Sequence, residues 1–454
     1  MEAPRYDSLP EPWMRNARAG PKLACLEVHL QVITPILGGG PTLRELDRLE
    51  VIRPASVRGQ LRFWWRALHG DKWDSPAQLY ENESRLWGRP ATDEGGRSAV
   101  EIRIRVLTRP NATDEDIDPV ETPGAYALWP ARQERRRNVP PAPRWEPGAR
   151  FKLTLVAPSD YEAELRNVVR AWILFGGYGG RTRRGLGSLT VVEREDEWLP
   201  ESPTRDALKA LFVRDIFAPP SGGSCDTPWL AGAALHVGEP SRNAQEAWIT
   251  ALGWLRDFRQ GTDGPCGKRA REPGSSLQQP RRPSISNWPE PDKVRHLTGG
   301  AWAHQPRHNA EPVWPRAGFG LPIIGRFQDK ARDGTRMHEP GPFEIRWRSG
   351  GVEHERLASP LIVKALPLAG GRFVPCALWL HRSLPADAEA GLVRQRPGGE
   401  PEDKEVDPRT AAPLGALVAP GDTPLFKALE GKASLREAFL DWLRDQRGTT
   451  VVAP

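Results

Sequence analysis

The N-terminal half of the sequence places several arginines at the spacing of one helix face. Arg58, Arg62 and Arg66 stand four residues apart, so a helix would carry them as one stripe of like charge. Like charges at this spacing disfavour an isolated helix by roughly a few tenths of a kcal/mol per pair. No acidic residue lies between Glu50 and Asp71 to offset them. The stripe therefore predicts an anionic partner, either carboxylates elsewhere in the fold or nucleic-acid phosphates, and we favour phosphates.

The residues around the stripe extend the same pattern. Arg53 adds a further cation just before it, and Ser56 is the expected N-cap of the helix. Of the adjacent Trp64 and Trp65, at least one is expected in the protein core, which leaves Trp64 as a candidate to stack on a base. We therefore count Arg53, Ser56 and Trp64 with the stripe as candidate RNA-binding residues.

A glycine-rich loop forms the second constellation, with six glycines in the twelve positions from 176 to 187. Glycines allow backbone N–H groups to approach a polyanion closely, and the arginines and threonine of the loop add donors. The loop follows a helix and precedes a strand, which is the reverse of the dinucleotide-binding fingerprint. Because its cations are spread along the chain, a single-stranded nucleic acid fits better than a mononucleotide. The candidate RNA contacts here are Gly177, Tyr178, Gly179, Gly180, Arg181, Thr182, Arg183 and Arg184.

The nine histidines are dispersed and predict neither a metal site nor a catalytic residue. His304 and His308 have the spacing of metal ligands, but no third ligand is near them, and we expect both to be exposed to solvent. His69 ends the arginine helix, where the helix dipole favours a cation, and His29 lies in the middle of a strand. A histidine beside phosphates could still serve as a general base for RNA cleavage. We expect no cofactor and no metal.

Composition excludes several classes of protein. The 454 residues predict two or three domains, and the net charge of +6 is not concentrated in a basic tail. The 44 glycines and 47 prolines exclude a simple helix bundle and predict long irregular loops. No apolar run is long enough to span a membrane. The four cysteines form no C-x-x-C pair, which fits a reducing cytoplasm.

Hydrophobic periodicity predicts the elements that position these residues. The first half reads as a β-α-β-β-α-β series, the pattern of ferredoxin-like and RNA-recognition-motif folds. Its strands are expected at 23–33, 100–107, 151–156 and 188–192, one helix is expected from Ser56, and a second is capped by Ser159 or Asp160.

The second half predicts another α+β domain after a linker with short elements over 193–243. Helices are expected at 244–258 and 435–443, and strands at 320–326, 343–348, 361–366 and 372–380. We expect two ferredoxin-like domains, 21–200 and 201–454, with long loops at 108–149, 260–284 and 383–423.

Taken together, these motifs resemble the RAMP superfamily of CRISPR effector proteins. The resemblance rests on Thr34-Pro35 at a strand end, Ser56-x-Arg58-Gly59, and the later Gly-Gly-x-Gly-Gly-Arg loop. It narrows to the family of first subunits of type III-B Cmr complexes. The residues that carry this narrower likeness are 52–66, Trp288-Pro289-Glu290-Pro291-Asp292, Pro315-Arg316-Ala317-Gly318-Phe319-Gly320-Leu321-Pro322-Ile323 and Arg356-Leu357-Ala358-Ser359-Pro360-Leu361.

The resemblance implies a non-catalytic subunit at one end of a cytoplasmic ribonucleoprotein in antiviral defence. Its implied partners are guide RNA, contacted at the 3′ region, single-stranded target RNA, and the other Cmr subunits, with no membrane. Two alternatives stay open. One is a metal-independent guide-RNA-processing endoribonuclease of the same fold, and the other is a protein-binding cap whose arginines face acidic partner surfaces.

Overall fold

A computed structural model describes most of the chain. The described residues are 22–90 apart from 39, 41 and 43, and then 95–222, 227–261, 286–298, 306–327, 339–394 and 405–454.

The first sheet has the ferredoxin-like arrangement that the sequence predicts. Its four strands are antiparallel in the order β3-β6-β1-β7, and one helix follows each of β1 and β6 along the chain. The elements are β1 (Leu23–Val32), α1 (Pro54–His69), β3 (Glu101–Thr108), β6 (Arg150–Pro158), α4 (Glu162–Phe175) and β7 (Leu189–Val191).

The second sheet repeats this arrangement. Its order, β12-β13-β8-β16, again places the first strand of the series between the third and the fourth. The elements are β8 (Trp229–Val237), α7 (Ala244–Arg259), β12 (Leu361–Leu368), β13 (Arg372–His381), α9 (Leu435–Arg447) and β16 (Thr450–Ala453). Two ferredoxin-like sheets are thereby confirmed, while the domain boundary at residue 200 stays a prediction.

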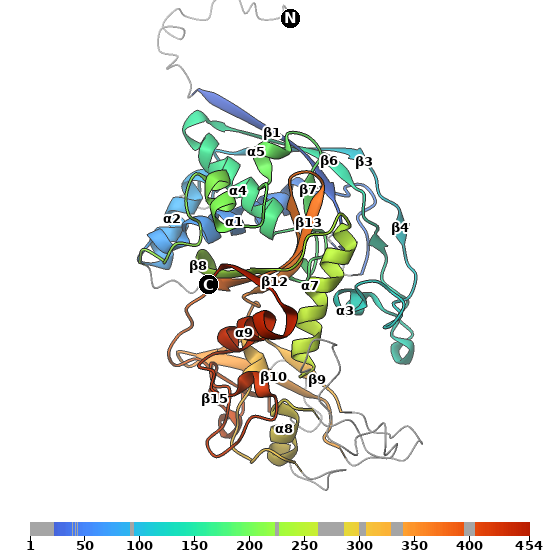
Figure 1. The fold of residues 1–454 in the computed structure, drawn as a ribbon, viewed down its shortest axis with the longest axis vertical. Helices are drawn as coiled ribbons and strands as arrows, with labels where there is room; N and C mark the ends of the chain where they lie inside the picture. The colour runs from blue at the N-terminus through green and yellow to red at the C-terminus, as the bar shows by residue number, and fades with distance from the viewer. Residues whose placement is uncertain are drawn as a thin grey trace, which may run out of the picture.

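The two sheets and their helices form alternating layers (Figure 1). Helices α1 and α4 lie between the sheets, because α1 contacts β8 and α4 contacts β12, and one hydrophobic core joins both sheets through them. Helices α7 and α9 cover the other face of the second sheet. The glycine-rich loop leaves the C-terminus of α4, so it lies where the two domains meet.

Several sequence expectations for elements are wrong. Helix α1 begins at Pro54 with Arg53 as the N-cap, because proline fits the first helical turn, so Ser56 is not the cap. A short 3-10 turn over Ser159–Tyr161 precedes α4, and neither Ser159 nor Asp160 caps it. Helix α2 (Pro76–Trp87) and strands β8 and β16 were not predicted from the sequence.

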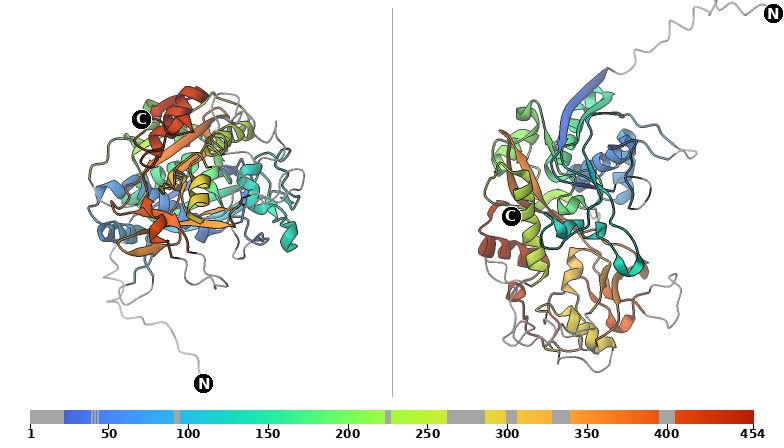
Figure 2. Two further views of the ribbon diagram at one scale, coloured as in Figure 1. Left: turned by 90° about the horizontal axis from the view of Figure 1, so that it is seen from below. Right: turned by 90° about the vertical axis from the view of Figure 1, so that its right-hand side faces the viewer.

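A third region, built around a small sheet, is inserted into the second domain at one end of the molecule (Figures 1 and 2). The strands expected at 320–326 and 343–348 belong to this sheet rather than to the ferredoxin-like one. The region contains α8 (Glu290–Thr298), β9 (Ile323–Gly325), β10 (Phe343–Ser349), β11 (Val352–His354), β14 (Glu389–Leu392) and β15 (Ala412–Pro413).

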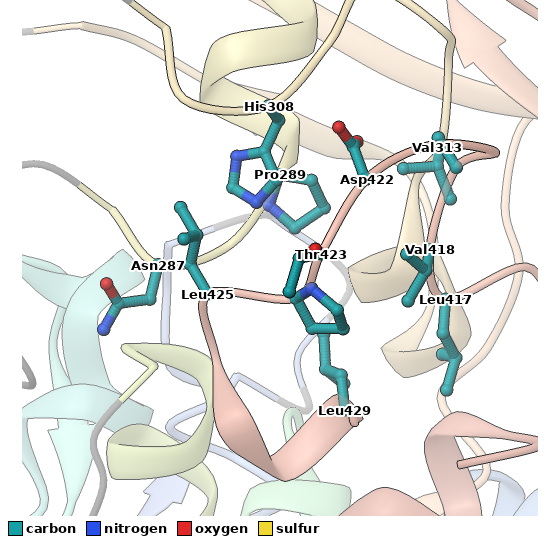
Figure 3. Close-up of a pocket in the computed structure, with 12 residues that line it drawn as sticks. Asn287, Pro289, His308, Val313, Leu417, Val418, Asp422, Thr423, Leu425 and Leu429 are labelled. Atoms are coloured by element: carbon teal, nitrogen blue, oxygen red, sulfur yellow. The ribbon is translucent and has the colours of Figure 1, made fainter. Parts of the chain in front are cut away.

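The interior of this region is held by buried ion pairs. The Lys293 ammonium, which is fully buried, lies 2.5 Å from a carboxylate oxygen of Asp422. His308 lies 2.9 Å from Asp292, so the expectation that His308 is exposed is wrong, and His304 lies outside the described residues. The small cavity beside them has a volume of about 10 Å³, room for at most one water (Figure 3). These groups are therefore structural.

The excursion expected over 108–149 forms a folded arm beside the first domain. Arg44 holds it by donating to the carbonyl oxygens of Pro130, Arg132 and Pro140. The arm contains β4 (Ala112–Thr113), α3 (Ala125–Leu128) and β5 (Arg144–Trp145), and β5 pairs with β2 (Ile36–Leu37). The remaining short helices are α5 (Glu195–Trp198) and α6 (Arg205–Phe212).

Candidate nucleic-acid interface

A groove of about 910 Å³ lies between the arm, the glycine-rich loop and α7. One wall is residues 119–126 together with Trp129 from the arm, and the opposite wall is the exposed side of α7 from Ile249 to Arg259. Arg181 and Arg184 of the glycine-rich loop also line it. Ile324 of β9 completes the lining, so four segments that are distant in the sequence build the groove.

Trp248 of α7 fixes the arm and the glycine-rich loop to this helix. Its indole Nε1 donates to the carbonyl oxygen of Arg184 at 2.7 Å. A Cβ added at Gly124 of the arm would lie 2.1 Å from the Trp248 ring, and one added at Gly185 would lie 2.4 Å from it. Both glycines have positive φ. Their lack of a side chain lets the arm and the loop close on the same buried ring.

Other glycines of the loop also serve internal packing, which corrects the expectation that they admit a polyanion. A Cβ at Gly187 would lie 1.8 Å from the carbonyl oxygen of Tyr178, and one at Gly180 would lie 2.9 Å from that of Leu37. The Thr34 hydroxyl donates to the Gly185 carbonyl oxygen at 2.7 Å. The loop is thus a tightly folded support for its arginines.

Among the described residues that line the groove, Glu121 is the one acid, and it forms no ion pair with the groove arginines. Within the described part of the chain, no carboxylate forms an ion pair with Arg181, Arg184 or Arg259. Burial, followed by the positive charges of Arg259 and others, lowers the pKa of Arg184 to about 10. Burial also lowers the pKa of Arg181, and Arg259 adds to this effect. An anion in the groove would relieve the repulsion among these arginines.

The groove also contains a paired arginine and two aromatic rings. Arg256 lines it but is paired with Asp257 at 2.8 Å, so its charge is already partly offset. The rings of Tyr126 and Trp129 also line the groove. Trp129 is 42% exposed, and the guanidinium carbon of Arg132 lies 4.4 Å from its ring centroid. Cations interleaved with exposed aromatic rings are typical of surfaces that bind single-stranded nucleic acids.

The arginine stripe of α1 has a different environment. Arg62 lies 2.7 Å and Arg66 lies 3.0 Å from the same buried carboxylate, Glu83 of α2. Arg58 donates to the Ser98 hydroxyl and to the Val100 carbonyl oxygen. The stripe therefore has internal acceptors, and phosphate contact by these three arginines stays a prediction that the geometry does not favour.

The other predicted residues beside the stripe are largely enclosed. The backbone N–H of Arg53 donates to the Tyr178 hydroxyl at 2.9 Å, and that ring is 1% exposed. The Tyr178 hydroxyl also bonds with Ser56. Trp64 is likewise 1% exposed. Stacking of a solvent-facing base on Tyr178 or Trp64 is therefore excluded in this conformation, because both rings complete the core between the sheets.

The histidines considered for catalysis lie away from the groove. Burial, then Arg214 and Lys72, lowers the pKa of His69 to about 3, so its imidazole is neutral near pH 7. His29 lies 3.0 Å from Glu193 on the first sheet. No histidine is among the described residues that line the groove.

The described residues offer neither a metal site nor a membrane-spanning helix. They contain no group of three or more histidine, cysteine, aspartate or glutamate side chains that could hold a metal ion. Among the same residues, no helix is long and apolar enough to cross a membrane.

Sequence reasoning missed half of the groove. Arg256, Arg259, Tyr126 and Trp129 were not among the candidates, whereas Arg181 and Arg184 were. From the sequence alone, Arg256 and Arg259 in the last turn of α7 are explained by the helix dipole, which favours cations at a helix C-terminus. Only the packing of α7 against the loop brings them beside Arg184.

Comparison with known proteins finds a family match that covers most of the first domain. Residues 29–190 match the model of the RAMP superfamily. A stretch of 152 residues is 29% identical to the CRISPR system Cmr subunit Cmr1-1 of Pyrococcus furiosus and covers 33% of this chain. The match spans 43% of that relative's length.

Two solved structures match this chain at low sequence identity. The crystal structure of apo Cmr1 from Pyrococcus furiosus is 17% identical and matches with a TM-score of 0.45, over 80% of this chain and 90% of the other. A chain of the type III-B Cmr-beta complex bound to cognate target RNA, solved by cryo-EM, is 11% identical with a TM-score of 0.40. That match covers 79% of this chain and 94% of the other.

Proposed function

Since residues 29–190 form a RAMP superfamily domain, we propose that this chain is a non-catalytic RNA-binding subunit of a type III-B CRISPR effector complex. The relative that it matches in sequence is named as a Cmr subunit, which supports this assignment. By the same resemblance, its partners are the 3′ region of guide RNA, single-stranded target RNA and other Cmr subunits in the cytoplasm.

The observation that carries the proposal is the charge balance of the groove. Arg181, Arg184 and Arg259 line one hollow of about 910 Å³ without an ion pair to any described carboxylate. Exposed Trp129 stands on the opposite wall. An RNA strand supplies both the phosphates that would offset the arginines and the bases that would stack on the ring. We therefore place RNA in the groove rather than along the arginine stripe of α1.

The experiment is a titration of fluorescent single-stranded RNA of guide length with the purified chain at several salt concentrations. We expect affinity to fall linearly on a logarithmic scale as salt rises, because each phosphate contact releases counterions. The same mixtures, run on a denaturing gel, should contain intact RNA. Absence of binding at low salt would contradict the proposal and favour a protein-binding cap.

The gel also tests the nuclease alternative. Cleavage in EDTA that is lost in His69→Ala would indicate a metal-independent endoribonuclease. We expect no such cleavage, because His69 is enclosed and does not line the groove.

A further inference from the structure

A second hollow lies against the glycine-rich loop, next to α1 rather than α7. Its volume is about 210 Å³, and Thr182 and Arg183 of the loop line it. The neighbouring Arg181 and Arg184 line the groove instead. Consecutive residues of the loop therefore line two different hollows. We call the second hollow the α1 pocket.

The α1 pocket combines aromatic rings with polar groups. Phe63 and Trp64 of α1 and Phe175 at the end of α4 line it, and Phe63 is the most accessible of the three rings. Polar groups come from Gln60 and Thr182. Trp64 and Phe175 are each 1% exposed, so Phe63 offers the accessible ring. A ring face beside polar groups suits a flat ring that bears heteroatoms, because such a ligand can pack on Phe63 and hydrogen-bond at its edge.

The pocket exists partly because Gly59 has no side chain. Gly59 lies in the interior of α1, where glycine costs about 1 kcal/mol relative to alanine. Its φ is not positive, and a Cβ built on it would meet nothing within 4 Å. Neither backbone conformation nor internal packing therefore requires glycine here, in contrast to Gly185 and Gly187. The missing side chain leaves open one wall of the α1 pocket.

Arg183 supplies an unused donor at the pocket. Its guanidinium carbon lies 5.5 Å from the centroid of the Phe63 ring. Its Nε is buried without a hydrogen-bond acceptor, and no described carboxylate pairs with it. Burial lowers the pKa of Arg183, and the positive charge of Arg382 lowers it further. A ligand that brings a carbonyl oxygen and a ring face would satisfy both the donor and the aromatic wall.

We propose that the α1 pocket takes one unstacked nucleobase of an RNA strand whose neighbouring phosphates lie in the groove on the other side of the glycine-rich loop. The base would pack against Phe63, with a carbonyl edge toward Arg183 and the amide of Gln60. Splayed bases held by aromatic rings and arginine are a usual way of binding single-stranded RNA. This inference rests on the proposed RNA-binding function and adds a contact to a base.

The test compares a short oligouridine with an abasic oligomer of the same length, so that phosphates are equal and only bases differ. The wild-type chain should bind oligouridine roughly fivefold or more tightly than the abasic oligomer. Gly59→Leu should fill the pocket and lower the ratio of the affinity for oligouridine to the affinity for the abasic oligomer. Any preference that remains would come from base contacts elsewhere, and affinity for the abasic oligomer should stay unchanged. Arg183→Met, which removes the donor but keeps apolar bulk, should lower the same ratio.

Controls separate this inference from the function on which it rests. Gly59→Ala should raise thermal stability, because alanine favours the helix and its Cβ meets no atom. Arg184→Gln should weaken both oligomers equally and leave the ratio unchanged. Wild-type protein that binds neither oligomer would overturn the proposed function. A ratio that Gly59→Leu and Arg183→Met leave unchanged would overturn the α1 pocket alone. Wild-type protein that binds both oligomers equally would overturn the α1 pocket and also the stacking of bases on Trp129.

Discussion

Two sets of arginines in the molecule have opposite surroundings. Arg62 and Arg66 of α1 share the buried carboxylate of Glu83, whereas Arg184 of the loop and Arg259 of α7 form no ion pair with any described acid. Sequence spacing made the first set look like the binding surface. Tertiary packing sets the position of the compensating acid, and that position decides which cations remain available to a partner.

The two sets of arginines also differ in their effect on the stability of the fold. The α1 arginines join α1 to α2, and breaking such a buried pair leaves a desolvated charge. The groove arginines are held close to one another by Trp248 and the loop backbone, at the expense of mutual repulsion. A bound polyanion would relieve that repulsion, so the groove is the more stable when occupied.

The largest effect should come from removing two groove charges together. Arg184→Gln combined with Arg259→Gln should weaken binding of single-stranded RNA by roughly tenfold or more at low salt. The slope of the logarithm of affinity against the logarithm of salt should become shallower by about 0.7 for each arginine that contacts a phosphate. Fluorescence titration at several salt concentrations measures both quantities.

Arg256→Gln is the matched control on the same helix, because Arg256 is already paired with Asp257. Its slope should change less than that of Arg259→Gln. Equal changes would mean that ion pairing does not distinguish the two positions, and the comparison would fail.

A stability measurement should give the reverse pattern at α1. Glu83→Gln removes the carboxylate shared by Arg62 and Arg66 and should lower the free energy of unfolding by about 2 kcal/mol. Affinity for RNA should stay within about twofold. Urea denaturation and RNA titration of the same sample test both statements.

The control at α2 is Glu81→Gln, since Glu81 is half-exposed and its pair with Arg89 spans 3.4 Å. We expect a change within about 0.5 kcal/mol. A large gain of RNA affinity in Glu83→Gln would instead mean that the α1 arginines bind phosphate once released.

A further effect appears only in the pH dependence of stability and concerns a buried lysine at the root of the glycine-rich loop. The Lys364 ammonium donates to the carbonyl oxygens of Ile173 and Gly176, and burial lowers its pKa to about 7. The unfolded chain keeps this proton up to about pH 10.4. Lys364 therefore makes the folded protein more stable as pH rises from about 7 toward 10, with no contribution to the slope below 7.

Lys364→Met should remove this rise in stability. The measurement is the difference between the unfolding free energies of the wild-type protein and the variant across that pH range. The neighbouring Cys376, whose pKa burial raises to about 12, is present in both proteins and largely cancels in the difference. A difference that does not vary with pH would contradict the assignment.

Much of the fold was predictable because its elements are strongly periodic. Strands β1, β3 and β6 have one face in the core, so apolar and polar residues alternate along them. Strand β8 was missed because it is buried on both faces, between α1 and the helices of the second domain, and its sequence WLAGAALHV does not alternate.

The candidate site was predictable only in part. Arg181, Thr182, Arg183 and Arg184 were singled out from composition, and the structure places them at two hollows. Arg259 of α7 and Phe63 of α1 lie beside the glycine-rich loop only because the two sheets pack as they do. Glu83, seventeen residues beyond Arg66, lies in a helix that the sequence did not reveal.

The central claim, that RNA lies in the groove, is tested most directly by crosslinking single-stranded RNA carrying 4-thiouridine to the purified chain and mapping the modified peptides by mass spectrometry. We predict crosslinks at the arm, in particular at Tyr126 and Trp129, and in the last turns of α7. Crosslinks confined to α1 and α2, with none in the arm or α7, would contradict the claim and return the binding surface to the arginine stripe.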